Sequence, residues 1–104
     1  MSAQYRSYFG VGVISHGSLL VKVYAPRGPD PQQPHSRDEV YIVACGNGEF
    51  VCGDAHKEFQ ATDLLFVPAR KIHRFENFTD DLTLWVIFYG SEGGEAHKNS
   101  SASD

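Results

Sequence analysis

The sequence has few basic residues and no long apolar run. It contains 9 lysines and arginines against 13 aspartates and glutamates, which gives a formal net charge of -4. A nucleic-acid partner is therefore not expected, because phosphate binding needs a basic face. No stretch approaches the roughly 20 apolar residues of a membrane-spanning helix, so no membrane partner is expected either. Residues 1–6 lack the apolar core of a signal peptide, which favours a cytoplasmic location.

Cysteine is scarce, and helical periodicity is missing. Cys45 and Cys52 lie on either side of a turn signal at residues 46–48. We interpret both as free thiols of a cytosolic protein, with a redox or metal pair as the alternative. No stretch shows a convincing helical period. At 104 residues, of which 41% are hydrophobic, the chain is long enough for one domain with a single core.

What the sequence does contain is a series of short strand-like segments. They are rich in β-branched and aromatic residues and are separated by glycine and proline turn signals. We expect strands in the ranges 5–14, 18–24, 39–43, 49–52, 56–60, 64–67 and 82–89. Many short strands without helices predict an all-β, jelly-roll type of barrel. We place this barrel in residues 1–90 and expect residues 91–104, which contain no bulky hydrophobe, to form a disordered tail.

Side chains that can bind a metal lie beside two of these apolar segments. His35 and Glu39 are four residues apart at the entrance of a strand, where alternate side chains point the same way, so both should face one interior. His73 follows the second apolar run, 64–68. Two histidines and one carboxylate are the ligands of many mononuclear non-haem iron sites. The sequence therefore predicts a divalent-metal site at His35, Glu39 and His73, and the alternative for the first two is a polar surface loop.

The spacing around His35 and Glu39 resembles the first motif of the small single-domain cupins. That motif runs histidine, any residue, histidine, three or four residues, glutamate, six residues and glycine. Here His35, Glu39 and Gly46 match it, and Gln33 stands at the position of the first histidine.

The segment around His73 resembles the second cupin motif. That motif runs glycine, five residues, proline, any residue, glycine, two residues, histidine, three residues and asparagine. Pro68, His73 and Asn77 match it, while Thr62 and Arg70 stand where the glycines would be. The two motifs together make the resemblance fairly specific, and it covers roughly residues 20–90.

The resemblance implies a cupin double-stranded β-helix, that is, a jelly-roll barrel, with a divalent transition metal near its open end. Iron, manganese, nickel, zinc and copper all remain candidates for this metal. Gln33 could ligate it weakly through its amide oxygen or hydrogen-bond a metal-bound water, and a solvated loop residue is the alternative.

The function that the resemblance implies is that of a metal-dependent enzyme. A dioxygenase, an isomerase and a lyase acting on a small polar organic acid or sugar-like molecule all fit. Two alternatives stay open: a non-catalytic module that binds a small ligand, and a cupin that holds no metal.

Glu39, Tyr41 and Arg70 are the candidates for catalytic roles. Glu39 could act as a base instead of a ligand. Tyr41 has the parity of Glu39, so its hydroxyl could lie near the site, although an aromatic of the barrel wall is the more frequent role. Arg70 could reach over the barrel mouth and hold an anionic substrate, and a solvated turn residue is its alternative.

A homodimer is expected as well as a small-molecule ligand. An early cupin strand often pairs with a second subunit, and the resemblance implies the same for this chain. The segment 82–89 is almost wholly apolar, which is typical of a strand that is buried on both faces or that lies against a partner. We expect Phe75, Trp85 and Phe88 to be core residues.

Overall fold

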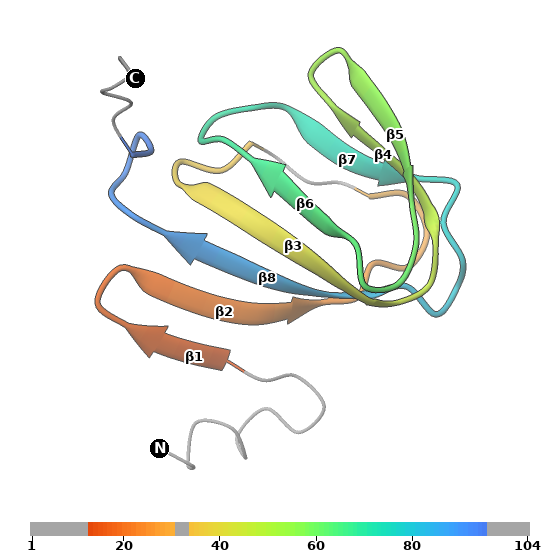
Figure 1. The fold of residues 1–104 in the computed structure, drawn as a ribbon, viewed down its shortest axis with the longest axis horizontal. Coiled ribbons are helices and arrows are strands. Elements are labelled where there is room, and N and C mark those ends of the chain that lie inside the picture. The colour runs from red at the N-terminus through yellow and green to blue at the C-terminus, as the bar shows by residue number, and fades with distance from the viewer. Residues whose placement is uncertain (1–12, 31–33, 96–104) are drawn as a thin grey trace.

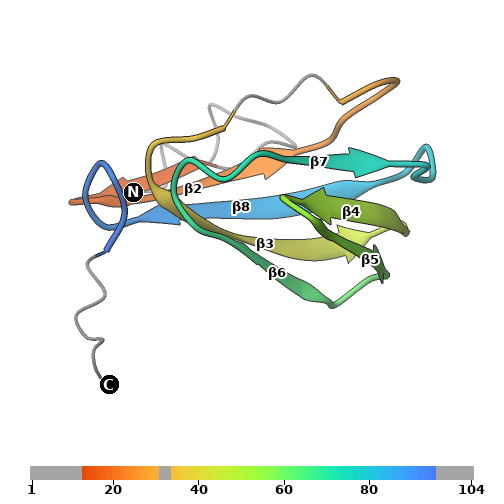
Figure 2. The same ribbon diagram turned by 90° about the horizontal axis from the view of Figure 1, so that it is seen from above.

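The computed structural model describes residues 13–30 and 34–95, which form two antiparallel sheets (Figures 1 and 2). A five-stranded sheet has the order β1-β2-β8-β3-β6, and a three-stranded sheet has the order β5-β4-β7. The predicted all-β jelly-roll fold is confirmed. No helix among the described residues could cross a membrane. The strands are β1 (Val13–His16), β2 (Leu19–Tyr24), β3 (Asp38–Cys45), β4 (Gly48–Cys52), β5 (Ala55–Phe59), β6 (Leu64–Val67), β7 (His73–Glu76) and β8 (Thr83–Tyr89).

The strand register places side chains in rows across the inner face of the five-stranded sheet. One row consists of Leu20, Phe88, Glu39 and Val67, on four neighbouring strands. Glu39 is thus a carboxylate in a row of apolar residues, and its side chain is fully buried. The inner faces of both sheets build the core from Tyr41, Val43, Phe50, Phe59, Leu65, Val67, Phe75, Leu82, Leu84, Val86 and Phe88.

Two rows of apolar residues cross the outer face of the same sheet, one over all five strands and the other over the four strands from β2 to β6. We call them the outer rows: Ile14, Val21, Ile87, Val40 and Phe66 form one, and Val23, Trp85, Ile42 and Leu64 form the other. Phe75 and Phe88 are buried as expected, but the prediction for Trp85 is wrong, because this residue lies on the outer face and is 40% exposed. The strand 83–89 alternates between buried and open positions, so the described structure covers only one of its faces.

The two ends of the described chain lie at the margins of the five-stranded sheet. The first strand runs from Val13 to His16, and residues 5–12 of the strand predicted at 5–14 lie outside the described residues. Residues 91–95 form a turn whose Glu95 N–H donates to Asp38 Oδ2 at 2.9 Å. The remainder of the predicted tail, residues 96–104, lies outside the described part of the chain.

Both residues that replace a glycine of the second motif adopt the backbone conformation that favours glycine. The φ angle is 77° at Thr62 and 68° at Arg70. A side chain with a Cβ costs about 1 to 2 kcal/mol in this left-handed region, and a β-branched threonine is a clear outlier there.

We expect Thr62→Gly to raise the free energy of unfolding by about 0.5 to 1 kcal/mol, because relief of this strain exceeds the entropy that glycine adds to the unfolded chain. Urea titration would measure the change. Thr83→Gly at the start of β8 is the control. It should destabilise the protein because glycine adds entropy to the unfolded chain and removes the hydrogen bond from Thr83 Oγ1 to the Asp81 carbonyl. Equal losses of stability in both variants would contradict the strain argument.

Candidate metal centre

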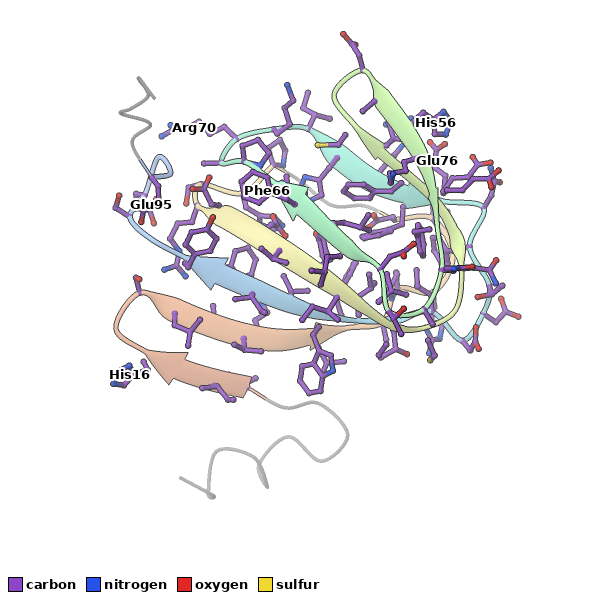
Figure 3. The ribbon with its side chains drawn as sticks, in the orientation of Figure 1. His16, His56, Phe66, Arg70, Glu76 and Glu95 are labelled. Atoms are coloured by element: carbon purple, nitrogen blue, oxygen red, sulfur yellow. The ribbon has the colours of Figure 1, made fainter. Side chains whose placement is uncertain are left out.

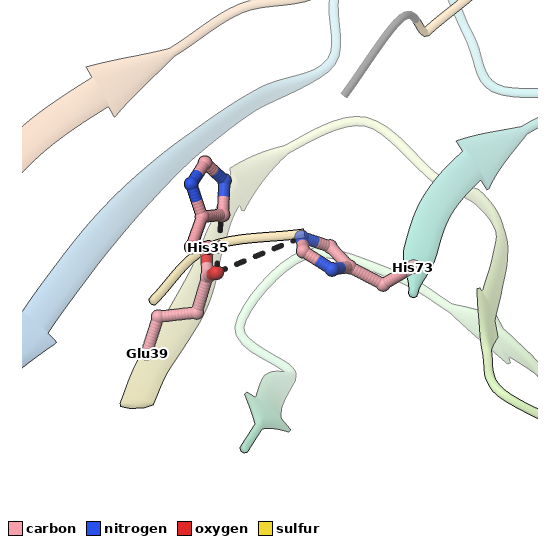
Figure 4. Close-up of side chains that lie close together, drawn as sticks. All are labelled: His35, Glu39 and His73. Carbon is pink, nitrogen blue, oxygen red and sulfur yellow. Dashed lines mark ion pairs between the residues drawn. The ribbon is translucent and has the colours of Figure 1, made fainter. Parts of the chain in front are cut away.

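Three side chains that are distant in the sequence meet between the two sheets (Figure 4). Glu39 projects from the inner face of β3, His73 is the first residue of β7, and His35 lies in the loop before β3. Glu39 Oε1 is 3.7 Å from His35 Nε2 and 3.6 Å from His73 Nε2. One ligand atom from each of the three residues lies within 4.8 Å of the other two. The structure therefore brings the three predicted metal residues together.

Two hydrogen bonds donated by backbone N–H groups of the β6–β7 loop hold the segments that carry the histidines. The Arg70 N–H donates to the His35 carbonyl at 2.6 Å, and the Ala69 N–H donates to Asp38 Oδ1 at 2.9 Å. The loop that precedes β7 is thereby tied to the segment that precedes β3. Both donors are backbone N–H groups of the β6–β7 loop. The positions of the histidines therefore depend little on which side chains occupy that loop.

His73 is oriented by its second ring nitrogen. Its Nδ1 lies 2.9 Å from the Lys71 carbonyl, which can only accept, so Nδ1 carries the proton and Nε2 presents its lone pair. The Tyr41 hydroxyl lies 3.0 Å from this Nε2 and donates to it. Tyr41 therefore reaches the site, and an ion bound at Nε2 would take the lone pair that the hydroxyl now uses.

Glu39 is buried without the hydrogen bonds that a carboxylate normally has. Neither of its oxygens has a hydrogen-bond partner among the described residues. Burial raises its pKa from 4.5 to about 7. The Lys22 ammonium opposes that rise, and so does the Tyr41 hydroxyl, which lies near the carboxylate but outside hydrogen-bond geometry, since its partner is His73 Nε2. A buried polar group without a partner is costly, and functional sites are where such groups occur.

The surroundings of His35 disfavour the charged form of its imidazole, as burial disfavours the charged form of Glu39. Burial lowers the pKa of His35, and the neighbouring His73 and Lys22 add to this effect, while Asp30 opposes it. A neutral imidazole has the free lone pair that a metal requires.

The donor set fits a divalent ion. Two ligand atoms that each lie about 2.1 Å from one ion are about 3 to 3.5 Å apart, close to the separations seen from Glu39 to the two histidines. The unpaired carboxylate would gain the missing partner, and both imidazoles present Nε2 to the same oxygen. His35, Glu39 and His73 are therefore the residues that would hold the ion.

Of the two other predicted site residues, Arg70 does not join this cluster, and the structure does not place Gln33. Gln33 lies outside the described residues. Arg70 is exposed in the β6–β7 loop, and its side chain points outward from the sheets (Figure 3). An alanine-sized group at Gly93 would be 3.6 Å from the Arg70 guanidinium, which places that guanidinium beside the turn at residues 91–95.

A second group of potential ligands lies on the outer surface of the three-stranded sheet, where the sequence did not suggest one. It consists of Glu49, His56 and Glu76 (Figure 3). Asn77 Nδ2 donates to Glu49 Oε1 at 3.1 Å, His56 Nε2 lies 3.2 Å from the same oxygen, and Arg74 pairs with Glu76. These groups satisfy one another in solvent, which is typical of a polar surface.

Sequence reasoning missed two cations near the metal centre. A hollow of about 230 Å³ borders His35, and its lining includes Lys22, Arg37 and Phe88. Lys22 shares the inner-face parity of Leu20 and Tyr24 in β2. A lysine within an apolar strand, on the same face as Leu20 and Tyr24, could have indicated this site. Its place beside the metal centre became clear only from the pairing of β2 with β8.

Comparisons with known proteins agree with this architecture. A family model described as "Cupin domain" matches residues 20–89. An uncharacterized protein of Streptomyces coelicolor is 34% identical over 59 residues, which cover 57% of this chain and 56% of the relative. The match thus spans only about half the length of that relative.

Solved structures with a similar fold have lower identity. A cupin 2 conserved barrel domain protein from Salinispora arenicola has a TM-score of 0.63 and 20% identity, covering 78% of this chain and 75% of the other. A structure of FeII HppE has a TM-score of 0.58 and 18% identity, covering 76% of this chain and 48% of the other. At identities of 20% and 18%, these similarities show a shared fold only.

Proposed function

Because this chain belongs to the cupin domain family, we propose that His35, Glu39 and His73 bind one divalent transition-metal ion. The observation that carries the proposal is the buried Glu39 carboxylate, which lacks hydrogen-bond partners among the described residues and faces two imidazole nitrogens. Iron, manganese, nickel, zinc and copper all accept imidazole and carboxylate donors. Gln33 remains a proposed additional ligand.

We further propose a metal-dependent enzyme of the dioxygenase, isomerase or lyase type. An ion with three protein ligands supplies open positions for a substrate oxygen, for water or for dioxygen. The Tyr41 hydroxyl would turn from His73 to hydrogen-bond a substrate oxygen, and Glu39 is the alternative base. The iron(II) named in the similar structure of FeII HppE supports this kind of chemistry on the fold. The substrate would be a small polar organic acid or sugar-like molecule.

One observation favours a second candidate, a metal-free module that binds a small ligand without catalysis. The Tyr41 hydroxyl already occupies the His73 Nε2 lone pair, so the site has a hydrogen-bonded arrangement without an ion. In that case Glu39 would be mostly neutral below about pH 7, because burial raises its pKa to about 7. Metal content distinguishes the two candidates.

Elemental analysis of protein purified without an affinity tag tests the proposal. We expect nearly one ion per chain in the wild type and at least a tenfold loss in His73→Ala, since one of three ligands is removed. His56→Ala is the matched control, because His56 belongs to the surface group and should not affect the ion. A wild type that contains no metal even after incubation with divalent ions would overturn the proposed function.

We propose that a second copy of this chain covers the outer rows. The rows contain no charged residue, so two copies can meet face to face without like-charge repulsion, whereas the chain as a whole is acidic. Five strands about 4.8 Å apart make a face about 24 Å wide, comparable to the patch that a standard protein interface occupies. Exposed Leu64 (65%), Phe66 (54%) and Trp85 (40%) would be buried in this homodimer.

A further inference from the structure

The hollow beside His35 is cationic in an acidic protein. It is lined by Leu20, Lys22, His35, Ser36, Arg37 and Phe88. Two of these residues are cations and none is acidic, although the chain carries a net charge of -4. A concave site with one sign of charge raises the local concentration of ions of the opposite sign.

The two cations are held over one aromatic ring. Lys22 Nζ and Arg37 Cζ each lie 5.9 Å from the centroid of the Phe88 ring. The Arg37 guanidinium also donates to the Ser18 carbonyl at 2.5 Å. Cation–π contacts of this kind restrict flexible side chains, so less entropy is lost when an anion binds between them.

The hollow and the metal centre share His35. The His35 side chain is 35% exposed, whereas the side chains of Glu39 and His73 are fully buried. Its ring lies 5.1 Å from the Phe88 ring that carries the two cations. The Lys22 ammonium is also close enough to lower the pKa of both His35 and Glu39. The hollow that Lys22 and Arg37 line therefore also opens onto His35, one of the three residues of the metal centre.

We propose that this hollow binds the carboxylate of a small organic anion, and the inference rests on the proposed metal function. Lys22 and Arg37 pair with the carboxylate, while another oxygen of the same molecule faces the metal centre. Lys22 and Arg37 can form charge-assisted hydrogen bonds to a carboxylate, whereas a neutral sugar-like ligand offers them only weaker neutral acceptors. The structure therefore selects the organic acid from the two substrate classes considered above.

Glycolate and ethylene glycol are the probes that test the inference. They have similar size, but only glycolate carries a carboxylate. In calorimetric titrations of metal-loaded protein, we expect glycolate to bind at least tenfold more tightly than ethylene glycol. Lys22→Gln and Arg37→Gln should each weaken glycolate binding about fivefold or more, as expected for the loss of one charge-assisted contact.

Lys57→Gln is the matched control. Lys57 is an exposed lysine of β5, on the other sheet, so its loss should leave glycolate binding unchanged. Metal content is measured on every sample, which separates the two proposals. Full metal content with equal binding of both probes, or equal effects of the Lys22 and Lys57 substitutions, would overturn the anion site alone. A wild type without metal would instead overturn the metal function on which the inference rests.

Discussion

Replacing Glu39 by glutamine is expected to stabilise the metal-free protein and to abolish its stabilisation by metal. Neither carboxylate oxygen has a hydrogen-bond partner among the described residues, so the ionised wild-type side chain is costly to bury. A neutral amide of nearly the same shape avoids the cost of burying a charge. We expect a gain on the order of 2 kcal/mol in the free energy of unfolding at pH 8.

The same variant should lose the response to metal. An ion that binds only the folded state at 100 times its dissociation constant stabilises the wild type by about 2.7 kcal/mol. Glutamine is a much poorer ligand than a carboxylate, so we expect little or no shift in the variant. Urea unfolding with and without the ion found by elemental analysis measures both effects. The substitution should raise the stability of the metal-free protein and remove the additional stability that the ion gives.

The gain in the metal-free variant should depend on pH. Burial raises the pKa of Glu39 from 4.5 to about 7, so the folded state binds the proton more tightly than the unfolded chain does. The metal-free wild type therefore loses stability as the pH rises from 4.5 to 7, whereas glutamine does not titrate. The difference between the two proteins should grow across this window and level off above it.

Glu58→Gln is the control for this experiment. Glu58 is an exposed carboxylate of β5, and its substitution should change neither stability nor the response to metal by more than about 0.5 kcal/mol. A metal-free Glu39→Gln protein that is less stable than the wild type at pH 8 would show that the carboxylate has favourable partners in the folded state. That result would remove the main argument for the metal centre.

Placing a charge in the outer rows is expected to separate the homodimer into monomers. Trp85 lies in the middle of one row, between Val23 and Ile42, and is 40% exposed in the single chain. A lysine at this position would be buried without a partner in the dimer. For Trp85→Lys we expect the dissociation constant of the dimer to rise at least 100-fold, or about 3 kcal/mol.

Sedimentation velocity at several protein concentrations measures this change. Ile72→Lys is a matched control, because Ile72 is 64% exposed in the β6–β7 loop and lies outside the outer rows. This control should remain dimeric. Trp85→Lys should be a folded monomer that still unfolds cooperatively in urea, which would show that the substitution acts on the interface and not on the fold. A wild type that is monomeric at about 100 µM, or a dimeric Trp85→Lys, would contradict the proposed interface.

Much of the candidate centre could be predicted because the information is local. The first motif fixes the four-residue separation of His35 and Glu39. The alternation of side chains along β3 then turns Glu39 inward. His73 could be found because proline and a turn precede it at a fixed distance. For Arg70, in contrast, the motif left two alternatives open, a cation over the barrel mouth and a solvated turn residue, and its side chain is exposed and points outward (Figure 3). Motif spacing sets a backbone position and does not set a long side chain's direction.

The amino-acid sequence by itself determined the class of fold, the approximate strand positions and the three residues proposed to bind metal. These depend on the two-residue period of a strand and on turn residues, which act over short distances along the chain. Only the tertiary structure decided that Lys22 of β2 lies over Phe88 of β8, and that nine apolar residues line up as the outer rows. Both follow from pairing and register between strands distant in the sequence. A shift of one residue would turn every such side chain to the opposite face, and no local pattern fixes that register.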